Sequence, residues 1–426
     1  MYRKDYRMTY YVDNINGSLI ADGASCDSPV SDHTILQVKA GDTVLFKRGN
    51  VYRSTLNLTA GEDGNPVTYG AWGDGDMPVF LGGTDVSLPK DWITTDKENV
   101  WECVRPTRGS VGNFVFNTDE CTATLRWEMN GLRLQGDFFD RLFIDNCFSE
   151  RTPDTSLRTG HLYMYSVGNP AQVYRHIEAI DYGEHILCRI KDNVIIDGLK
   201  FKNNDFAIAG DGGKNVIIRN CAFENIGGCV WNYKLRIRFG NAVEFWNIAE
   251  NVLVENCSFK NVYDSCVTHQ GPGAKTRPAL NFTVRNCLFD TYGMAAFEYR
   301  DKLPGNSSFT GNICLNAGTG FAMLGEEGAR RSEIWPQPMG HHIFLWRIED
   351  ATDGGGLLIA DNSFGSAPVG AAIYSIINEK AEAQITLKNN RYTRNDVLLI
   401  HFGGESFTDL EVYKQKFVQD SGSEYF

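Results

Sequence analysis

The chain has 426 residues, with 41 Lys and Arg against 53 Asp and Glu, and a net charge of −12 at pH 7. This acidic balance argues against nucleic acid as a partner, and mildly against a strongly polyanionic substrate unless basic groups cluster locally. No run of 18 apolar residues occurs, so the sequence predicts no membrane-spanning helix.

Residues 1–100 are predicted to form N-terminal coils of a stacked β structure. The segments KAGDTVLFKRGNVY from Lys39 and GNPVTYGAWGDGDMPVFLGG from Gly64 are β-rich and are bounded by turn residues. The first residues contain no apolar core of a secretion signal. We therefore expect a cytoplasmic protein, or a secreted one if a signal has been removed.

Residues 101–167 break this pattern, because aromatic residues and Arg become frequent and no repeat is visible. Coil-like sequence resumes directly afterwards. We therefore expect an insertion folded onto the flank of the coils, not an independent domain, with the main coils at 168–405.

A repeated phrase in the main coils predicts the fold. NVIIRNCAFENI at Asn215, NVLVENCSFKNV at Asn251 and NFTVRNCLFDTY at Asn281 are three versions of one unit. Each unit is β-branched and alternates in polarity, giving a short strand, an Asn turn, a second strand, a loop and a third strand. Such repeats build stacked architectures, and this one predicts an all-β, right-handed parallel β-helix. The sequence lacks the Trp-Asp signature of a propeller and the leucine consensus of a horseshoe repeat.

Aligned units predict columns of like residues. Asn tolerates left-handed backbone angles, so a turn ladder is expected from five asparagines: Asn220, Asn256, Asn286, Asn312 and Asn362. Cys221, Cys257 and Cys287 share the next position and are predicted to be inward, stacked and unbridged. Phe223, Phe259 and Phe289 form a second inward column. Eleven cysteines without a CxxC pair give no support for a metal site, and reduced thiols favour the cytoplasm.

The C-terminal segment 406–426 is predicted to cover the last coil. Thr408 and Glu411 have the spacing of a capping box, and Phe407 and Val412 that of a hydrophobic staple, which predicts a helix from Asp409 to about Val418. An uncovered solenoid end is an aggregation edge. The whole chain, 1–426, is therefore expected to be one domain.

The third strands align as AVEFWN from Ala242, CVTHQG from Cys266, AAFEYR from Ala295 and GFAMLG from Gly320. The predicted inward residues are Val243, Val267, Phe297 and Phe321. The predicted outward residues are Glu244, Thr268, Glu298 and Ala322, followed two positions later by Trp246, Gln270, Arg300 and Leu324. Two carboxylates, an indole, an amide and a guanidinium then share one outer face.

Carboxylates beside an exposed Trp and an amide are what a sugar site requires, because sugar rings stack on indole and hydroxyls bond polar groups. Glu244 and Glu298 are two coils apart, about 9.6 Å between backbones, which does not separate inverting from retaining geometry. Asp264 enters at the loop before the middle strand. The three are the catalytic candidates. An ordinary exposed strand stabilised by Glu–Arg pairs is the alternative, and Asp264 alone could cap a loop.

The residues predicted to contact a substrate are Trp246, Gln270, Arg300 and Arg238. Arg238 belongs to the run WNYKLRIRFG from Trp231, which also carries Lys234 and Arg236. This run is either a solvated strand or a basic patch suited to a carboxylated sugar. His269 falls on the inward parity, but a one-residue slip would expose it, so it is kept among the substrate contacts. His341 and His342 end a long excursion, RRSEIWPQPMGHH, that could overhang the same face.

The stretch GNAVEFWNIAENVLVENCSFKNVYDSCVTHQG, followed by GNICLNAGTGF and MGHHIFLWR, resembles the β-helical glycoside hydrolases of family 141. This family includes α-L-fucosidases and xylanases within the pectate-lyase-like superfold. The resemblance implies two acidic catalytic residues, with Asp264 at the matching position and Glu244 or Glu298 as its partner. Asp264-Ser265-Cys266 also resembles the Asp-Asp-Cys of polygalacturonases, but Ser265 replaces the second Asp and the other motifs of that group are missing.

Three functions are compatible with the sequence. A glycoside hydrolase would use paired carboxylates and no cofactor or metal. A polysaccharide lyase acting on a uronate polymer would need a base and a cation such as Arg300, Arg238 or Lys234, with Ca²⁺ possible. A non-catalytic carbohydrate-binding or tailspike-like protein is the third possibility; a trimeric tailspike would need an apolar exterior stripe along all coils, which is not found in the sequence. The face is richer in carboxylates than in cations, which favours hydrolysis of a plant-type or complex carbohydrate.

Overall fold

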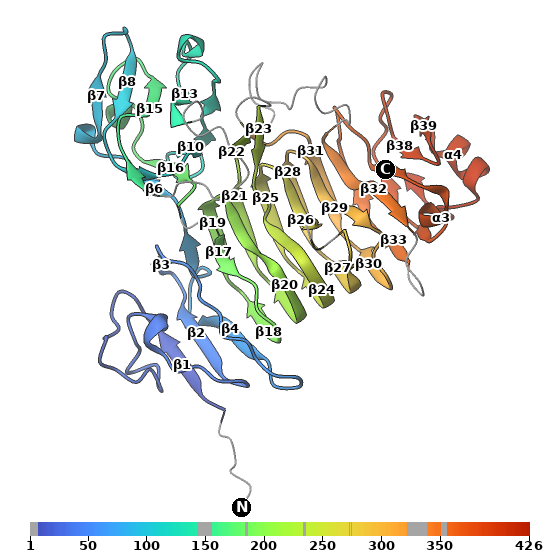
Figure 1. Cartoon of the computed structure of the whole chain (residues 1–426), viewed down its shortest axis with the longest axis horizontal. Helices are drawn as coiled ribbons and strands as arrows, with labels where there is room; N and C mark the ends of the chain where they lie inside the picture. The colour runs from blue at the N-terminus through green and yellow to red at the C-terminus, as the bar shows by residue number, and fades with distance from the viewer. Residues whose placement is uncertain are drawn as a thin grey trace, which may run out of the picture.

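Short β-branched segments joined by asparagine turns determine the architecture of the chain. The computed structural model describes residues 7–142, 156–183, 186–232, 236–271, 273, 275–321, 339–350 and 356–426. Within these ranges the chain winds into a parallel β-helix, with coils laid side by side from the N-terminal strands to the C-terminal cap (Figure 1). No described helix is long and apolar enough to cross a membrane.

Three parallel sheets form the walls of the β-helix. The first sheet contains β1 Thr9–Val12, β2 Thr43–Lys47, β4 Val67–Trp72, β18 Val194–Asp197, β20 Phe206–Arg219, β24 Val243–Glu255, β27 Leu280–Arg285, β30 Ser307–Thr310, β33 Leu357–Ala360 and β36 Ile385–Lys388. The second contains β3 Val51–Tyr52, β5 Val79–Leu81, β19 Lys200–Asn204, β21 Ala222–Ile226, β25 Ser258–Val262, β28 Leu288–Tyr292, β31 Ile313–Ala317, β34 Ser363–Phe364, β37 Arg391–Tyr392 and β40 Glu424–Tyr425.

The third sheet carries the predicted site. It contains β17 Ile186–Arg189, the first halves of β20 and β24, β26 Ser265–His269, β29 Ala295–Lys302, β32 His341–Asp350, β35 Ile373–Ile377 and β38 Ile400–Phe402. Strands β20 and β24 are long because they continue from the third sheet into the first. The remaining short elements of the coils are η1 His33–Ile35, the antiparallel pair β22 Cys229–Asn232 and β23 Ile237–Phe239, and α3 Glu379–Glu382.

The inward columns are those expected from the aligned repeats. Cys221, Cys257 and Cys287 are buried, and none of the ten described cysteines is in a disulfide. The rings of Phe223 and Phe259 stack with centroids 4.7 Å apart, and Phe259 and Phe289 repeat this spacing. One coil therefore packs directly on the next throughout the core.

The asparagine ladder was predicted correctly for the first three members only. Asn220, Asn256 and Asn286 occupy one turn column, with φ of 53°, 53° and 54°. Asn312 and Asn362 lie one position later and are buried, so their placement in that column is wrong. They continue the column of cysteines, because Leu288 pairs with Ile313 and thus sets Cys287 opposite Asn312.

Amide side chains replace thiols in this buried column. Asn312 Oδ1 accepts the Cys287 N–H at 2.9 Å, and its Nδ2 donates to the Val284 carbonyl at 3.1 Å. Asn362 Oδ1 in turn accepts from Asn312 Nδ2 at 3.1 Å. A buried amide is tolerated because both its donor and its acceptor are satisfied.

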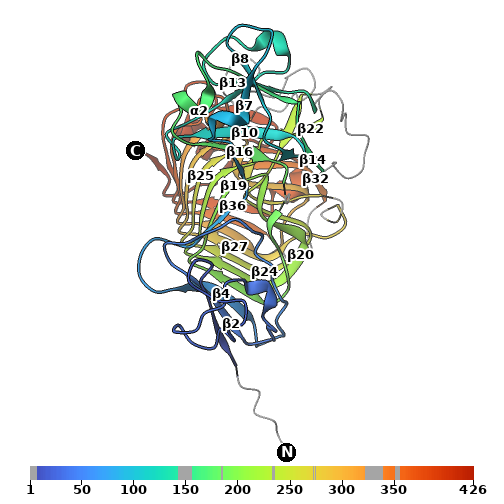
Figure 2. The same ribbon diagram turned by 90° about the vertical axis from the view of Figure 1, so that its left-hand side faces the viewer.

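The described residues of 84–142 and 156–181 form a small lobe on the flank of the β-helix (Figure 2). Its elements are β6 Thr84–Asp85, η2 Pro89–Asp91, β7 Trp92–Thr94, β8 Val100–Cys103, β9 Thr107–Arg108, β10 Val111–Phe116, β11 Cys121–Thr122, β12 Thr124–Leu125, η3 Met129–Gly131, β13 Asp137–Asp140, β14 Leu157–Arg158, β15 Leu162–Tyr165, α2 Pro170–Val173 and β16 Ile177–Asp181. The lobe has its own buried cluster, which includes Trp92, Phe114 and Trp127. The described part of the segment 101–167 lies wholly inside it.

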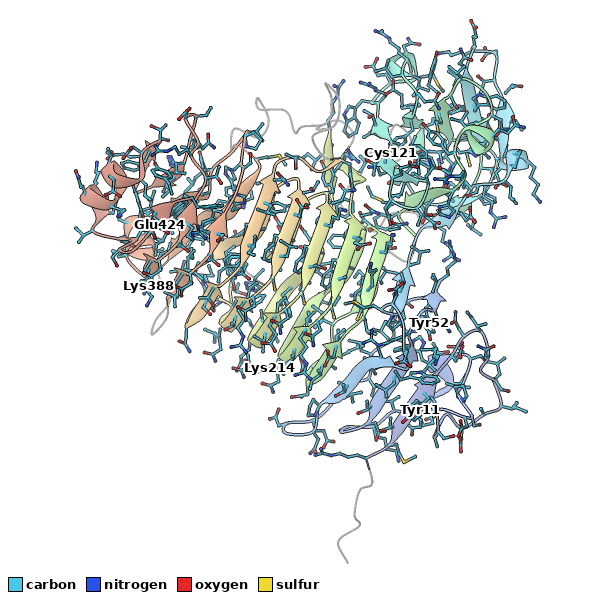
Figure 3. The ribbon with its side chains drawn as sticks, turned by 180° about the vertical axis from the view of Figure 1, so that it is seen from behind. Tyr11, Tyr52, Cys121, Lys214, Lys388 and Glu424 are labelled. Atoms are coloured by element: carbon cyan, nitrogen blue, oxygen red, sulfur yellow. The ribbon has the colours of Figure 1, made fainter. Side chains whose placement is uncertain are left out.

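Polar contacts join the lobe to the coils. Arg53 Nη1 donates to Glu178 Oε1 at 2.6 Å, and Asn225 Nδ2 donates to Asp119 Oδ1 at 2.7 Å. Figure 3 shows Cys121 in the lobe, well separated from Lys214 and Lys388 at the far edge of the coils. The lobe thus sits beside the edge at which the third-sheet strands begin (Figure 1).

Helix α4, Leu410–Phe417, covers the last coil together with β39 Glu405–Phe407, as a C-terminal cap. The cap residue is Asp409, not the predicted Thr408: its Oδ1 accepts from the N–H groups of Glu411 and Val412. The predicted staple is also wrong, because Val412 is 56% exposed. Phe407 packs instead on Tyr413.

Candidate active site

The outer face of the third sheet has the register expected from the sequence. Val243 pairs with Val267, and Val267 with Phe297, and all three are fully buried in the core. Strand alternation places the next residues on the outer side. Glu244 is therefore opposite Thr268, and Thr268 opposite Glu298, in one row across three coils.

The fourth strand of the alignment was wrong. The partner of β29 is β32, which sets Phe344 opposite Glu298 and Trp346 opposite Arg300. The long excursion separates the second and third strands of this coil instead of following the third. Ala322 and Leu324 lie outside the described residues, and Phe321 is buried beside Tyr263.

Glu298 is a fully buried carboxylate with several partners. Its Oε1 accepts from Arg300 Nε at 2.5 Å and from Trp346 Nε1 at 2.8 Å, and its Oε2 accepts from Ser265 Oγ at 2.5 Å. Burial acts to raise the pKa of Glu298, but the charge of Arg300 and these hydrogen bonds outweigh burial. The pKa therefore lies below its ordinary value, and Glu298 is ionised at neutral pH.

Glu244 has the opposite electrostatic environment. Burial raises its pKa to about 8; the hydrogen bond from Asn241 and the charge of Arg300 act against this rise, and the charge of Asp264 adds to it. Asn241 Nδ2 donates to Glu244 Oε2 at 2.9 Å. Glu244 is therefore mainly protonated at pH 7, whereas Glu298 is not. Two carboxyl groups whose pKa values are driven apart by their surroundings are the usual sign of an acid and its anionic partner.

The sequence did not predict three residues that hold these carboxyl groups. Asn241 Oδ1 accepts the Ser265 N–H at 2.7 Å, so Asn241 and Ser265 connect the two glutamates through hydrogen bonds. Trp346 donates to Glu298, and the Arg300 guanidinium lies 4.5 Å from the centroid of the Trp346 ring. Two features of the sequence could have pointed to these residues: Asn241 lies two positions before the strand that carries Glu244, and Ser265 directly follows Asp264.

Asp264 lies at the corner before β26 and is 3% exposed. Its backbone N–H donates to the Gly240 carbonyl, which places it beside the turn that leads into the Glu244 strand. Its charge contributes to the raised pKa of Glu244, so the two carboxyl groups are electrostatic neighbours. The structure thus brings the three predicted catalytic residues together on one face.

Trp246, Gln270 and Arg300 form the next row of the same face. Trp246 and Arg300 are partly exposed, and Gln270 is 7% exposed. Arg189, which the sequence did not single out, lies in the row of Glu244 two coils away and has its guanidinium 5.9 Å from the centroid of the Trp246 ring. Solvent therefore reaches the site beside Trp246 and Arg300.

Arg238 and His269 do not belong to this group. Arg238 is 2% exposed and donates to the carbonyls of Gly228 at 2.7 Å and of Gly112 in the lobe at 2.5 Å. It therefore ties the lobe to the coils and is not available to a substrate on the outer face. His269 points into the core, where its Nε2 lies 2.8 Å from the Asn247 carbonyl.

Among the other predicted basic and histidine residues that the structure describes, His341 lies on the outer side, where its buried ring stacks on Tyr374 in the row of Glu298 and Phe344. Arg236 faces Glu128 of the lobe at 3.9 Å, and Lys234 lies outside the described residues. His341 and His342 belong to strand β32 and are fully buried, so they do not overhang the site as part of a loop. His342 Nε2 lies 3.0 Å from the Gly365 carbonyl inside the β-helix.

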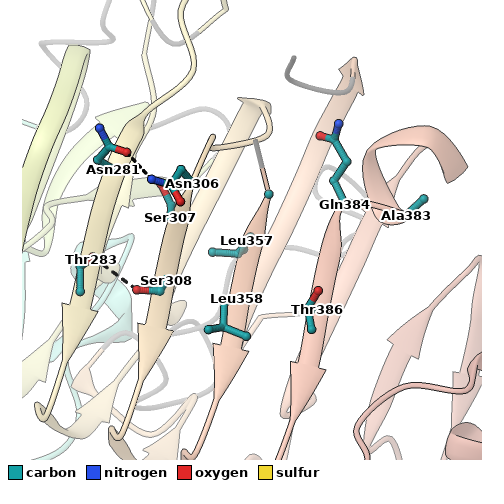
Figure 4. Close-up of a pocket in the computed structure, with 11 residues that line it drawn as sticks. Asn281, Thr283, Asn306, Ser307, Ser308, Leu357, Leu358, Ala383, Gln384 and Thr386 are labelled. Atoms are coloured by element: carbon teal, nitrogen blue, oxygen red, sulfur yellow. Dashed lines mark hydrogen bonds between the residues drawn. The ribbon is translucent and has the colours of Figure 1, made fainter. Parts of the chain in front are cut away.

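An open groove lies on a different wall of the β-helix. A groove of about 970 Å³ crosses the first sheet over β27, β30, β33 and β36 (Figure 4). Its described lining comprises Asn281, Thr283, Asn306, Ser307, Ser308, Gly356, Leu357, Leu358, Ala383, Gln384 and Thr386. These side chains include no acid or base, so acid–base chemistry is assigned to the third sheet.

No three described His, Cys, Asp or Glu side chains gather closely enough to hold a metal ion.

A family model described as the right-handed β-helix region matches residues 173–331. This match and the sheet topology confirm the predicted fold, a right-handed parallel β-helix. A comparison with curated protein sequences gives no match.

Solved structures with low sequence identity share this architecture. A GH136 lacto-N-biosidase from Eubacterium ramulus aligns with a TM-score of 0.52 and 13% identity over 93% of this chain and 62% of that one. XylC, solved in complex with xylose, aligns with a TM-score of 0.52 and 12% identity over 90% and 62%. This chain thus spans less than two thirds of either protein. A structure described as a glycoside hydrolase gives a TM-score of 0.50 and 9% identity over 98% and 96%.

Proposed function

We propose that this chain is a glycoside hydrolase in which Glu244 is the general acid and Glu298 its anionic partner. The observation that carries the proposal is the single row in which the two carboxyl groups stand on the outer face, one protonated and one ionised at neutral pH. Glycoside hydrolysis needs such a pair: one group to protonate the leaving oxygen and one to activate water or attack the sugar.

The hydrogen bonds suggest which atom of Glu298 reacts. Its Oε1 already accepts two hydrogen bonds, whereas among the described residues Oε2 accepts one, from Ser265. A carboxylate oxygen has two lone pairs, so Oε2 retains an acceptor position for a water proton or for bond formation. Asp264 is the second candidate for the anionic role, since it lies near Glu244 and on the coil between the two glutamates.

The surrounding residues suit a sugar ring. Trp246 offers a partly exposed indole, and Gln270 offers an amide directly after β26, the strand between the two glutamates. Arg300 is engaged by Glu298 and so stabilises that carboxylate; it is less suited to neutralise the carboxyl group of a uronate, as a lyase requires. The arrangement therefore favours hydrolysis over elimination.

The fold comparisons are consistent with this proposal, because the named neighbours include a lacto-N-biosidase and a glycoside hydrolase. The resemblance to glycoside hydrolase family 141, which includes α-L-fucosidases and xylanases, supports the proposal of a glycosidase. The substrate class proposed is a plant-type or complex oligosaccharide.

The test is a screen of aryl glycosides and cell-wall oligosaccharides by reducing-sugar release, with absorbance at 235 nm on uronate polymers in parallel. Hydrolysis predicts new reducing ends without absorbance at 235 nm, whereas a lyase would give the absorbance. A carbohydrate-binding protein would give neither. Glu255→Gln is the matched control for variants of the two glutamates, because Glu255 forms an ion pair with Arg285 on the first sheet, away from the site.

A further inference from the structure

Strand β26 lies between the two glutamate strands and carries a hydroxyl without a protein partner. Thr268 is fully buried, and within the described part of the chain its Oγ1 makes no hydrogen bond. Leaving a buried hydroxyl unpaired costs about 1–3 kcal/mol. A valine of nearly the same shape would avoid that cost, so the hydroxyl calls for a partner that is not part of the protein.

The two neighbours of Thr268 are already oriented by other groups. Glu244 is held by Asn241, and Glu298 by Ser265, Arg300 and Trp346. Thr268 lies one strand from each of them, at about 4.8 Å between backbones. A water molecule bound to Thr268 Oγ1 would lie within reach of both carboxyl groups.

We propose that Thr268 holds the water molecule that hydrolyses the glycosidic bond, which rests on the proposed glycosidase function. The oxygen of this water forms the new bond to the anomeric carbon of the sugar, either directly or at the stage of a glycosyl-enzyme. One proton of the water passes to an anionic carboxylate. When the glycosidic bond breaks, its electron pair stays on the leaving oxygen, which takes the proton of Glu244. Thr268 itself gains and loses nothing; it is a positioning residue.

Gln270 supports this assignment from the position just after the same strand. Gln270 directly follows β26, its N–H donates to the Phe245 carbonyl at 3.0 Å, and it is 7% exposed. If strand alternation continues for this one residue, its side chain shares the outer face with Thr268. The middle strand thus supplies polar groups for water and substrate, and the flanking strands supply the groups that exchange protons.

Thr268→Val and Thr268→Ser separate a water-positioning role from a structural one. Valine removes the hydroxyl and keeps the shape. We therefore expect kcat to fall about 10²-fold, as when a reactant is misplaced by about 1 Å, with KM little changed. Serine restores the hydroxyl, so most of kcat should return. Thermal stability of Thr268→Val should stay close to that of the wild type, because Oγ1 makes no hydrogen bond to the described protein residues that valine would break. Thr283→Val, on the first sheet, is the control and should leave kcat unchanged.

A high-resolution crystal structure of the wild type and of Thr268→Val gives a readout independent of activity. The proposal expects ordered water on Thr268 Oγ1 between the glutamates, and its loss in the valine variant. Full kcat in Thr268→Val, failure of serine to restore kcat, or no water at Oγ1 would overturn it. If the wild type cleaves no glycoside, the proposed function fails, and the crystallographic result still decides whether Thr268 binds water.

Discussion

Asn241 and Ser265 join the two glutamates of the outer face. Asn241 donates to Glu244 Oε2 through Nδ2 and accepts the Ser265 N–H through Oδ1, and Ser265 Oγ donates to Glu298 Oε2, at 2.9, 2.7 and 2.5 Å. Each carboxyl group thus has one oxygen fixed by a residue at the start of a strand. The pair is oriented by the backbone of two adjacent coils, which is a rigid support for acid–base chemistry.

Asn241→Ala should shift the alkaline limb of the pH–rate profile. The hydrogen bond from Asn241 lowers the pKa of Glu244, so its removal raises that pKa further above the wild-type value of about 8. Because Glu244 acts while protonated, the decline of kcat/KM at high pH should then move to higher pH, with a lower maximum. The control is Asn251→Ala, which removes the exposed hydrogen bond from Asn251 Nδ2 to Asn215 Oδ1 on the first sheet and should leave the profile in place. An unchanged or lowered alkaline limb in Asn241→Ala would contradict the assignment.

Glu244→Gln should stabilise the fold at alkaline pH. The pKa of Glu244 is raised in the folded state, so its contribution to stability is complete below its unfolded pKa and is lost as pH rises through about 8. A neutral glutamine of the same shape escapes this loss. We expect a gain of roughly 1–3 kcal/mol in the free energy of unfolding at pH 8 and little gain at pH 4. Urea unfolding at the two pH values measures the difference; equal effects at both would contradict a raised pKa.

Arg300→Met should make Glu298 harder to ionise. The charge of Arg300 is the largest influence that lowers the pKa of Glu298, so without it burial dominates and the acidic limb of kcat/KM moves to higher pH. The free energy of unfolding should fall by about 1–3 kcal/mol, less than for a fully buried pair because Arg300 is partly exposed. Arg285→Met breaks a similar pair with Glu255 on the first sheet and should leave the pH profile unchanged.

Asn312→Ala should destabilise the coils more than Asn286→Gly. Asn312 is buried and bonds the Cys287 N–H, the Val284 carbonyl and Asn362, so alanine leaves several buried groups unpaired, at about 2–4 kcal/mol in total. Asn286 is exposed at φ of 54°, where glycine fits without strain. Denaturant unfolding of both variants tests the buried column; equal losses would place the two asparagines in the same environment.

The sequence predicted the outer pair because strand periodicity carries over from coil to coil. Val243, Val267 and Phe297 point inward in each repeat, so the parity of the following residue follows directly. The same reasoning fails at corners, where no alternation applies. Asn241 and Ser265 stand at strand starts, and only the turn geometry shows that their side chains reach the glutamates.

Long insertions and distant partners account for the other differences. Trp346 was missed because its strand follows a long excursion, so the local alignment took GFAMLG from Gly320 as the third strand instead of β32. Arg238 was predicted to contact substrate because its run is basic, yet its acceptor Gly112 is 126 positions earlier in the lobe. A side chain's burial depends on such contacts, which sequence spacing does not reveal.

The central claim is that Glu244 protonates the leaving group. The most direct test is the activity of Glu244→Gln on two glycosides of the same sugar, one with a dinitrophenyl leaving group and one with an unactivated alcohol. A dinitrophenolate leaves without protonation, so the variant should keep most of its rate on that substrate and lose about 10²–10⁴-fold on the other. Glu298→Gln should lose rate on both, as should Asp264→Asn if Asp264 is the reacting anion. If Glu244→Gln cleaves the unactivated glycoside as fast as the wild type, the acid lies elsewhere and the account is contradicted.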